Sequence, residues 1–160
     1  MSEFNIICVD DQREVLSAVR KDLRVLGSSF EIVDCESAQE ALEVLEELDA
    51  EGVYVPLIIC DHVMPEQSGV DFLADMNKDM RFAKIKKLLL TGLATHEDTI
   101  RAINQAHIDR YMEKPWDKEE LLKVVKALFT EYLLASGIDY QPYISLLDQN
   151  ILYEHLRVQS

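Results

Sequence analysis

Short apolar segments recur along the chain and are separated by longer amphipathic stretches. The five segments lie at Phe4–Val9, Phe30–Val33, Leu57–Cys60, Leu88–Leu90 and Tyr111–Met112. The middle segments are almost continuously apolar, as expected of strands that are buried on both faces of a sheet. The pattern therefore predicts five β-strands.

Each predicted strand is followed by a stretch in which apolar residues recur every three or four positions, which is typical of an amphipathic helix. The apolar positions are Leu16, Val19, Leu23 and Leu26; Ala38, Ala41, Leu42, Leu45 and Leu48; Phe72, Leu73, Met76 and Met80; Thr99, Ile100, Ile103 and Ala106; and Leu121, Val125, Leu128 and Tyr132. Alternation of strand and helix predicts an α/β fold, a doubly wound parallel sheet with helices on both faces.

Acidic residues stand directly after two of the predicted strands. Asp10 and Asp11 follow the first strand, and Asp61 follows the third. Binding sites in such sheets form at the carboxyl ends of the strands, so these carboxylates should meet. Like charges so close together favour a bound cation, and a cluster of oxygen ligands alone suits Mg²⁺. The alternative is that Asp10 or Asp11 caps the following helix, which would explain one acid but not all three.

Three further polar positions end the fourth and fifth predicted strands, namely Thr91, Gly92 and Lys114. A threonine hydroxyl and a glycine N–H can donate to phosphoryl oxygens, and a lysine ammonium can offset their charge. Each residue alone also fits a simple strand end or a surface position. Together with the acids they supply metal ligands, a nucleophile, a hydroxyl and a cation, which are the parts that phosphoryl transfer requires.

The bulk properties narrow the class of protein. A chain of 160 residues fits one domain with a short extension, and its net charge of −14 argues against direct binding to nucleic acid. Neither a signal peptide nor a membrane-spanning segment is recognisable, so we expect a cytoplasmic protein without membrane association. The three cysteines, Cys8, Cys35 and Cys60, form no C-x-x-C pair, so neither a disulfide framework nor a zinc site is expected. Cys8 and Cys60 lie in apolar runs and are expected to be small buried hydrophobes.

The ordered set of motifs resembles the receiver domain of bacterial two-component response regulators. The matching pieces are Asp10-Asp11, Asp61-His62-Val63-Met64-Pro65 with Gly69, Thr91-Gly92, and Tyr111-Met112-Glu113-Lys114-Pro115-Trp116. The resemblance covers about Phe4 to Leu134. It implies the flavodoxin-like fold of the chemotaxis regulators, with strand order 2-1-3-4-5. Residues 1–136 would form the receiver domain, and residues 137–160 a C-terminal helical tail or the start of a linker to an absent output domain.

The resemblance also implies a role for each chemical position. Asp61 would be the phosphoacceptor, and Lys114 would pair with Asp61 or with its phosphoryl group. Asp10, Asp11, Asp61 and the backbone carbonyl of Val63 would hold Mg²⁺. The backbone N–H groups of His62 and Gly92 would help to hold the phosphoryl group, and the Lys114–Pro115 peptide bond would be cis.

The same resemblance implies a switch. Thr91 would move toward the phosphoryl group and Tyr111 would turn inward, which would change the face made by the fourth helix, the fifth strand and the fifth helix. The residues two positions after Asp61 and Thr91 tune dephosphorylation in the family. Here they are the apolar Val63 and Leu93, so we expect them to impede water and to prolong the phosphorylated state.

These roles describe a phosphorelay signalling domain whose partner is a sensor histidine kinase or a phosphotransfer protein. It would catalyse only its own phosphorylation and dephosphorylation. One alternative is a Mg²⁺-dependent aspartyl-phosphate hydrolase, although such enzymes carry an Asp-x-Asp motif after the first strand and Asp10 and Asp11 are adjacent. The other alternative is a receiver-like interaction module that works without phosphate.

The predicted fifth helix carries a second apolar stripe of Leu122, Phe129 and Leu133. A second apolar face needs a covering partner. Either the tail around Leu146–Leu156 folds back on it, or a second protomer packs there. We favour a tail that extends the fifth helix and supports a homodimer.

Overall fold

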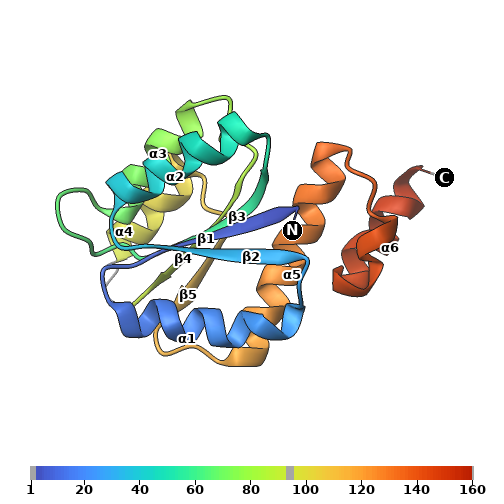
Figure 1. The fold of residues 1–160 in the computed structure, drawn as a ribbon, viewed down its shortest axis with the longest axis horizontal. Coiled ribbons are helices and arrows are strands. Elements are labelled where there is room, and N and C mark those ends of the chain that lie inside the picture. Colours follow the sequence, from blue (N-terminus) through green and yellow to red (C-terminus); the bar gives the residue numbers. More distant parts are fainter. Residues whose placement is uncertain (1–2, 93–95, 160) are drawn as a thin grey trace.

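The centre of the molecule is a five-stranded parallel sheet. The computed structural model describes residues 3–92 and 96–159. The strands are β1 (Phe4–Val9), β2 (Phe30–Cys35), β3 (Tyr54–Cys60), β4 (Lys86–Thr91) and β5 (Arg110–Glu113) (Figure 1). They are hydrogen-bonded in the order β2-β1-β3-β4-β5. The predicted fold class and strand order are confirmed.

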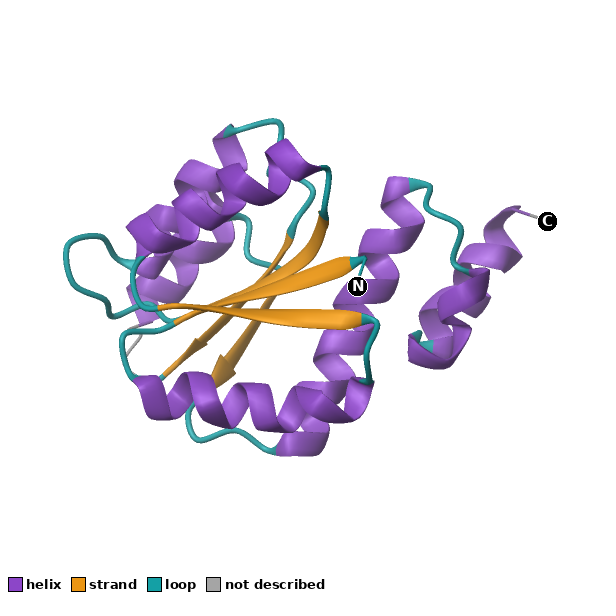
Figure 2. Cartoon of the chain, in the orientation of Figure 1, coloured by secondary structure: helices purple, strands orange, loops and turns teal. Residues whose placement is uncertain are grey.

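Helices cover both faces of the sheet. They are α1 (Arg13–Leu23), α2 (Ala38–Glu51), α3 (Gly69–Lys78), α4 (His96–Arg101), α5 (Lys118–Ser136) and α6 (Gln149–Gln159), with short 3₁₀ helices η1 (Arg24–Leu26) and η3 (Gln141–Leu146) and the π-helix η2 (Ala102–Ala106). One face carries α1 and α5, and the other carries α2, α3 and α4 (Figure 2).

The core consists of two apolar clusters, one on each side of the sheet. Within β1, Ile6 and Cys8 belong to the cluster under α1 and α5, whereas Ile7 and Val9 belong to the cluster under α2 and α3. Successive strand residues point to opposite faces, so a strand covered on both sides must be apolar at every position. This burial explains the continuous apolar runs in the sequence.

Three of the predicted helical stripes are partly wrong. Leu42 of the second stripe is exposed on α2. Ile100 and Ile103 are exposed, while Ala102 and Ala106 are buried. Residues 102–106 form a π-helix, whose wider turn shifts the residues that face the core. Met80 lies beyond the end of α3 and is 93% exposed, because the chain leaves the helix after Lys78.

The tail does not extend the fifth helix, so that prediction is wrong. Helix α5 ends at Ser136, and Gly137 adopts a left-handed conformation with φ of 71° that stops the helix. The chain then turns, and η3 and α6 lie against α5 at the right-hand end of the molecule (Figure 1). Phe129 and Leu133 of the second stripe are buried together with Leu147 and Leu152 of the tail. The covering partner of this stripe is therefore the tail of the same chain.

Specific contacts fix the tail in place. The Thr130 hydroxyl, which is fully buried, donates to the Lys126 carbonyl at 2.7 Å and accepts the Asp148 N–H at 2.8 Å. The ring of Tyr143 packs edge-on against Phe4 with centroids 5.0 Å apart. The Tyr143 hydroxyl donates to the carboxylate of Glu3. The tail is thus joined both to α5 and to the beginning of β1.

Within the described residues, we find no helix that combines the length and the apolar character needed to cross a membrane.

We expect Leu152→Ala to lower the free energy of unfolding by about 2–4 kcal/mol, because it would leave a cavity between α6 and α5. Urea denaturation measures this change. Leu156→Ala on the same helix is the matched control, since Leu156 is 45% exposed, and it should cost less than about 1 kcal/mol. Equal stability of the two variants would show that the tail does not pack as described.

Candidate functional site

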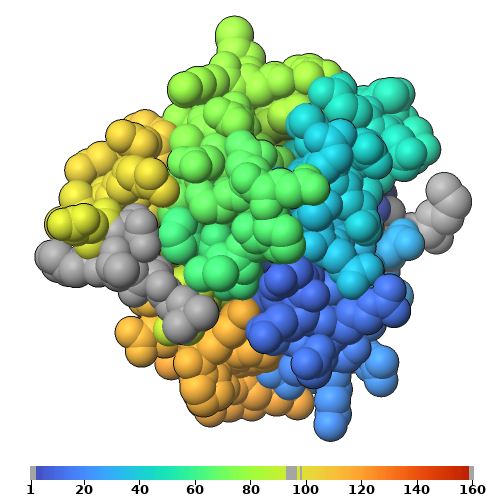
Figure 3. All heavy atoms as spheres, turned by 90° about the vertical axis from the view of Figure 1, so that its left-hand side faces the viewer, coloured from blue at the N-terminus to red at the C-terminus, as the bar shows by residue number. Residues whose placement is uncertain are grey.

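The candidate site lies at the edge of the sheet where the strands end. Val9 at the end of β1 is paired with Cys60 at the end of β3. The Asp61 N–H donates to the Val9 carbonyl at 2.9 Å. This pairing places Asp10, Asp11 and Asp61 beside one another. In Figure 3, which faces this edge, the chain after β1 (blue), the chain after β3 (green) and the chain after β5 (orange) meet.

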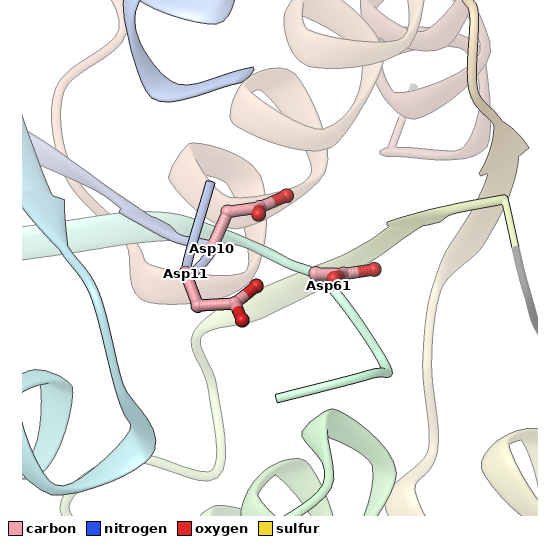
Figure 4. Close-up of side chains that lie close together, drawn as sticks. All are labelled: Asp10, Asp11 and Asp61. Carbon is pink, nitrogen blue, oxygen red and sulfur yellow. The ribbon is translucent and has the colours of Figure 1, made fainter. Parts of the chain in front are cut away.

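The three carboxylates converge as the sequence predicts. One oxygen of each lies within 4.8 Å of the others, in an arrangement that Figure 4 shows in close-up. Asp10 and Asp61 are buried, whereas Asp11 is exposed. The cluster offers only oxygen ligands, which is the chemistry that Mg²⁺ prefers. The residues present therefore fit a magnesium ion.

Lys114 is the cation that faces this cluster. Its Nζ lies 2.6 Å from Oδ2 of Asp10 and 3.5 Å from Oδ1 of Asp61. The predicted pairing with Asp61 is therefore the longer of two contacts, and the shorter one is with Asp10. Burial raises the pKa of the Asp10 carboxyl, and the hydrogen bond from Lys114 opposes this rise.

Asp10 also has a local structural role. Its Oδ1 accepts the Gln12 N–H at 2.9 Å, immediately before α1 begins at Arg13. The helix-start alternative thus accounts for part of the geometry at Asp10. It does not account for Asp11 or Asp61, because neither accepts such a bond at the start of α1 among the described residues.

The Asp61 carboxylate is hydrogen-bonded to the next residue in the chain, His62. Its Oδ1 accepts the His62 N–H at 2.9 Å. In the part of the chain that the structure describes, nothing donates a hydrogen bond to Oδ2 of Asp61. One oxygen of this carboxylate is therefore fixed, and the other is available for chemistry. The His62 N–H, expected to bind a phosphoryl group, is bonded to the carboxylate that would carry it.

An open hollow of about 270 Å³ lies over the acids. Its lining consists of Asp11, Gln12, Asp61, Val63, Thr91, Gly92 and Lys114. Thr91 is buried and Val63 is 46% exposed at the rim. Asp10 lies next to the hollow through its contact with Lys114. Most of the predicted site residues are thus brought together by the fold.

One predicted position, Tyr111, lies away from the hollow. Tyr111 packs as a partly buried ring against the core cluster under α2 and α3, and it does not line the hollow. Leu93 lies outside the described residues. Conversely, Gln12 lines the hollow, although nothing but its place after Asp11 could have singled it out beforehand. The Lys114–Pro115 peptide bond is cis, as expected.

Gly69 occupies a position with no room for a side chain. A Cβ there would lie 1.9 Å from the backbone oxygen of Asp61. The Gly69 N–H donates to the His62 carbonyl at 2.8 Å, which joins the first residue of α3 to the segment that follows β3. The glycine eight residues after Asp61 is therefore required by close backbone approach.

The three cysteines are free, and Cys8 and Cys60 are buried as predicted; Cys35 is buried as well. Burial raises the pKa of the Cys60 thiol well above its usual value, and it raises that of Cys35 to about 12. Cys60 adjoins Asp61, yet its thiol is kept protonated by the core around it. These thiols are therefore unsuited to serve as nucleophiles or metal ligands.

Comparison with known proteins agrees with this geometry. Residues 6–126 match the family described as the response regulator receiver domain. The hydrogenase transcriptional regulatory protein HoxA of Bradyrhizobium diazoefficiens is 33% identical over 139 residues, which are 84% of this chain and 27% of that protein. The chain therefore spans about a quarter of the length of this relative.

Solved structures show the same architecture. The signal receiver domain of an HD domain-containing protein from Pseudomonas fluorescens Pf-5 has a TM-score of 0.73 and 25% identity, over 84% of this chain and 92% of that one. A CheY-like response regulator receiver domain protein from Methanospirillum hungatei JF-1 has a TM-score of 0.69 and 27% identity, over 82% of this chain and 97% of that one. With the match over residues 6–126, these likenesses establish that the chain belongs to the receiver domain family of two-component response regulators.

Proposed function

We propose that this receiver domain accepts a phosphoryl group on Asp61 from a sensor histidine kinase or a phosphotransfer protein. The observation that carries the proposal is the convergence of three carboxylates and Lys114 beside an open hollow at the end of the sheet. Phosphoryl transfer depends mainly on positioning and on charge neutralisation, and these groups supply both. We place the reaction in the cytoplasm, where such kinases present their phosphohistidine.

In the proposed reaction, Oδ2 of Asp61 attacks the phosphorus of a phosphohistidine. The new P–O bond forms as the P–N bond breaks, and the leaving imidazole keeps the electron pair and takes up a proton. Lys114 lies 3.5 Å from the other Asp61 oxygen and offsets the charge that gathers on the phosphoryl oxygens. The contact of His62 N–H with Oδ1 keeps the attacking oxygen turned toward the hollow.

A magnesium ion would be held by Asp10, Asp11, Asp61 and the backbone carbonyl of Val63. When bound, it supplies positive charge to the carboxylates and to the phosphoryl oxygens. Asp10 keeps ligand capacity although both its oxygens already accept hydrogen bonds, because each carboxylate oxygen has two lone-pair sites.

The switch in this proposal begins at Thr91. Thr91 and Gly92 both line the hollow, which supports a contact of the Thr91 hydroxyl and the Gly92 N–H with a phosphoryl group on Asp61. Movement of Thr91 would alter the packing of Tyr111, whose strand neighbours β4. The face made by α4, β5 and α5 would change in turn, and it carries the exposed side chains of Ile100 and Ile103 that could meet a target.

We propose a signalling domain in preference to the two alternatives. A hydrolase would place its nucleophile in an Asp-x-Asp motif after β1, and that region has adjacent acids of which Asp10 is bonded to Lys114. A phosphate-independent module would not need Thr91, Asp61 and Lys114 around one hollow. The absence of direct binding to nucleic acid remains a prediction from the net charge, since the HoxA relative is named as a transcriptional regulator.

Incubation with acetyl phosphate and Mg²⁺ should add one phosphoryl group to the protein. We expect Asp61→Asn or chelation of Mg²⁺ to abolish the gain in mass, because each removes an essential part of the site. Asp49→Asn, which changes an exposed carboxylate of α2, is the matched control and should leave phosphorylation intact. Phosphorylation that persists in Asp61→Asn would refute the central proposal.

Val63→Asn should shorten the lifetime of the phosphorylated state several-fold. The apolar Val63 side chain lines the hollow beside Asp61, where an amide could position a water for attack on the acyl phosphate. Loss of phosphoryl mass over time measures the rate. Faster dephosphorylation of the unmodified protein than of the variant would contradict this role for Val63.

The proposal also includes a homodimer through α5 and the tail, which fewer residues support than the sequence suggested. Phe129 and Leu133 no longer support it, because the tail covers them within one chain. The exposed side chains of Tyr153 and Leu156 on α6 still do. Size-exclusion chromatography with and without beryllofluoride should show a shift to the dimer that Tyr153→Ser abolishes. No change in size would remove phosphorylation-driven dimerisation from the proposal.

A further inference from the structure

A second hollow lies apart from the one around Asp61. It has a volume of about 770 Å³ and is bounded by η1 after α1, by the first half of α5 and by η3 of the tail. We call it the tail groove. Among the described residues, it shares no lining residue with the hollow around Asp61.

Positive charge gathers around the tail groove although the chain as a whole carries −14. Lys118, Lys123 and Lys126 line it, with Glu119 as the one acid. None of these three ammonium groups lies within 4.0 Å of a carboxylate of the described residues, in contrast to Arg81, which is paired with Glu46 and Asp79. Unpaired lysines in so acidic a chain leave a local surface that attracts negative charge.

The tail groove is apolar between the lysines. Leu122 lies between Lys118 and Lys126 on one side of α5, at spacings of four residues. Val25 of η1 is 66% exposed at the opposite side, and Leu146 of η3 forms the end nearest the tail. An apolar floor with a rim of lysines is the surface that an amphipathic helix recognises when its polar face is acidic.

The tail supplies one wall of the groove. Ser145 and Leu146 belong to η3, which is held by the contact of Tyr143 with Phe4 and by the bond from Asp148 N–H to Thr130. The groove therefore exists because the tail folds back on α5. It is a feature of the packed chain and not of α5 alone.

We propose that the tail groove binds an acidic amphipathic helix of another protein. The apolar side of such a helix would cover Val25, Leu122 and Leu146, and its carboxylates would reach Lys118 and Lys123. The net charge of the chain repels an acidic partner from most of the remaining surface, so this groove would also set the position of the partner. The site is separate from Asp61 and does not depend on phosphorylation.

Other occupants fit the groove less well. Bases of single-stranded nucleic acid stack on aromatic rings, and the described lining of the groove contains none. A second copy of this chain would bring two surfaces of net charge −14 together, which is unfavourable.

A labelled synthetic peptide tests the proposal with the full chain. The peptide has about 16 residues, or some four helical turns, with leucines along one face and glutamates elsewhere. A peptide of the same composition in scrambled order serves as its control. Fluorescence anisotropy measures binding to the unmodified protein, to Lys118→Glu/Lys123→Glu and to Val25→Ser. Lys78→Glu/Lys84→Glu is the matched charge control, since both lysines are exposed and lie outside the groove.

We expect binding of the amphipathic peptide to weaken about tenfold or more in Lys118→Glu/Lys123→Glu, and to change less than about twofold in Lys78→Glu/Lys84→Glu. Val25→Ser should weaken it several-fold, and added salt should weaken it in the unmodified protein. Circular dichroism establishes that each variant is folded.

Equal binding by the two lysine variants, or equal binding of the scrambled peptide, would overturn the proposal. So would tighter binding of a single-stranded DNA oligonucleotide that the same lysine substitutions abolish. A dimer of the unmodified protein that is lost in Lys118→Glu/Lys123→Glu would assign the groove to a second copy instead.

Discussion

The pairing of β1 with β3 is the constraint on which the site depends. Because Val9 and Cys60 are held in register and the Asp61 N–H bonds to the Val9 carbonyl, the acids that follow both strands must lie together. Two of these carboxylates are buried, so their mutual repulsion is only weakly screened by water. The backbone ladder and the ammonium of Lys114 hold the charges in an arrangement that they would not adopt alone. The sheet thus maintains a local excess of negative charge that a cation can relieve.

Much of this arrangement could be predicted from the sequence. Buried strands appear as continuous apolar runs, and the residues that follow these runs mark the ends of the strands. The apolar run Phe4–Val9 coincides with β1, since both faces of that strand are covered by helices. Asp10, Asp11 and Asp61 could be grouped because parallel strands end at one edge. The preference of Lys114 for Asp10 could not be predicted, since it depends on side-chain distances of 2.6 and 3.5 Å that no residue pattern encodes.

The predictions that were wrong concern local turns that override periodicity. Ile103 has the spacing of a core residue in an α-helix, but the π-helix around it turns that side chain outward. The tail was expected to continue α5, yet a single left-handed residue, Gly137, reverses the direction of the chain. Leu147 and Leu152 can then pack with Phe129, so the tail of the same chain covers an apolar surface that had suggested a second protomer. For the tail, the fold-back on α5 was one of two alternatives, and the wrong one was favoured.

The absence of space at Gly69 couples the backbone of the site to helix α3. The Asp61 backbone is pressed against the first residue of α3, a helix whose inner side chains are buried in the core. The same helix packs against η2, the π-helix that continues α4 and carries the exposed Ile103. A displacement of the Asp61 backbone should therefore be transmitted to α3 and through it to η2. A glycine thereby connects the site to a distant surface, although it carries no functional group.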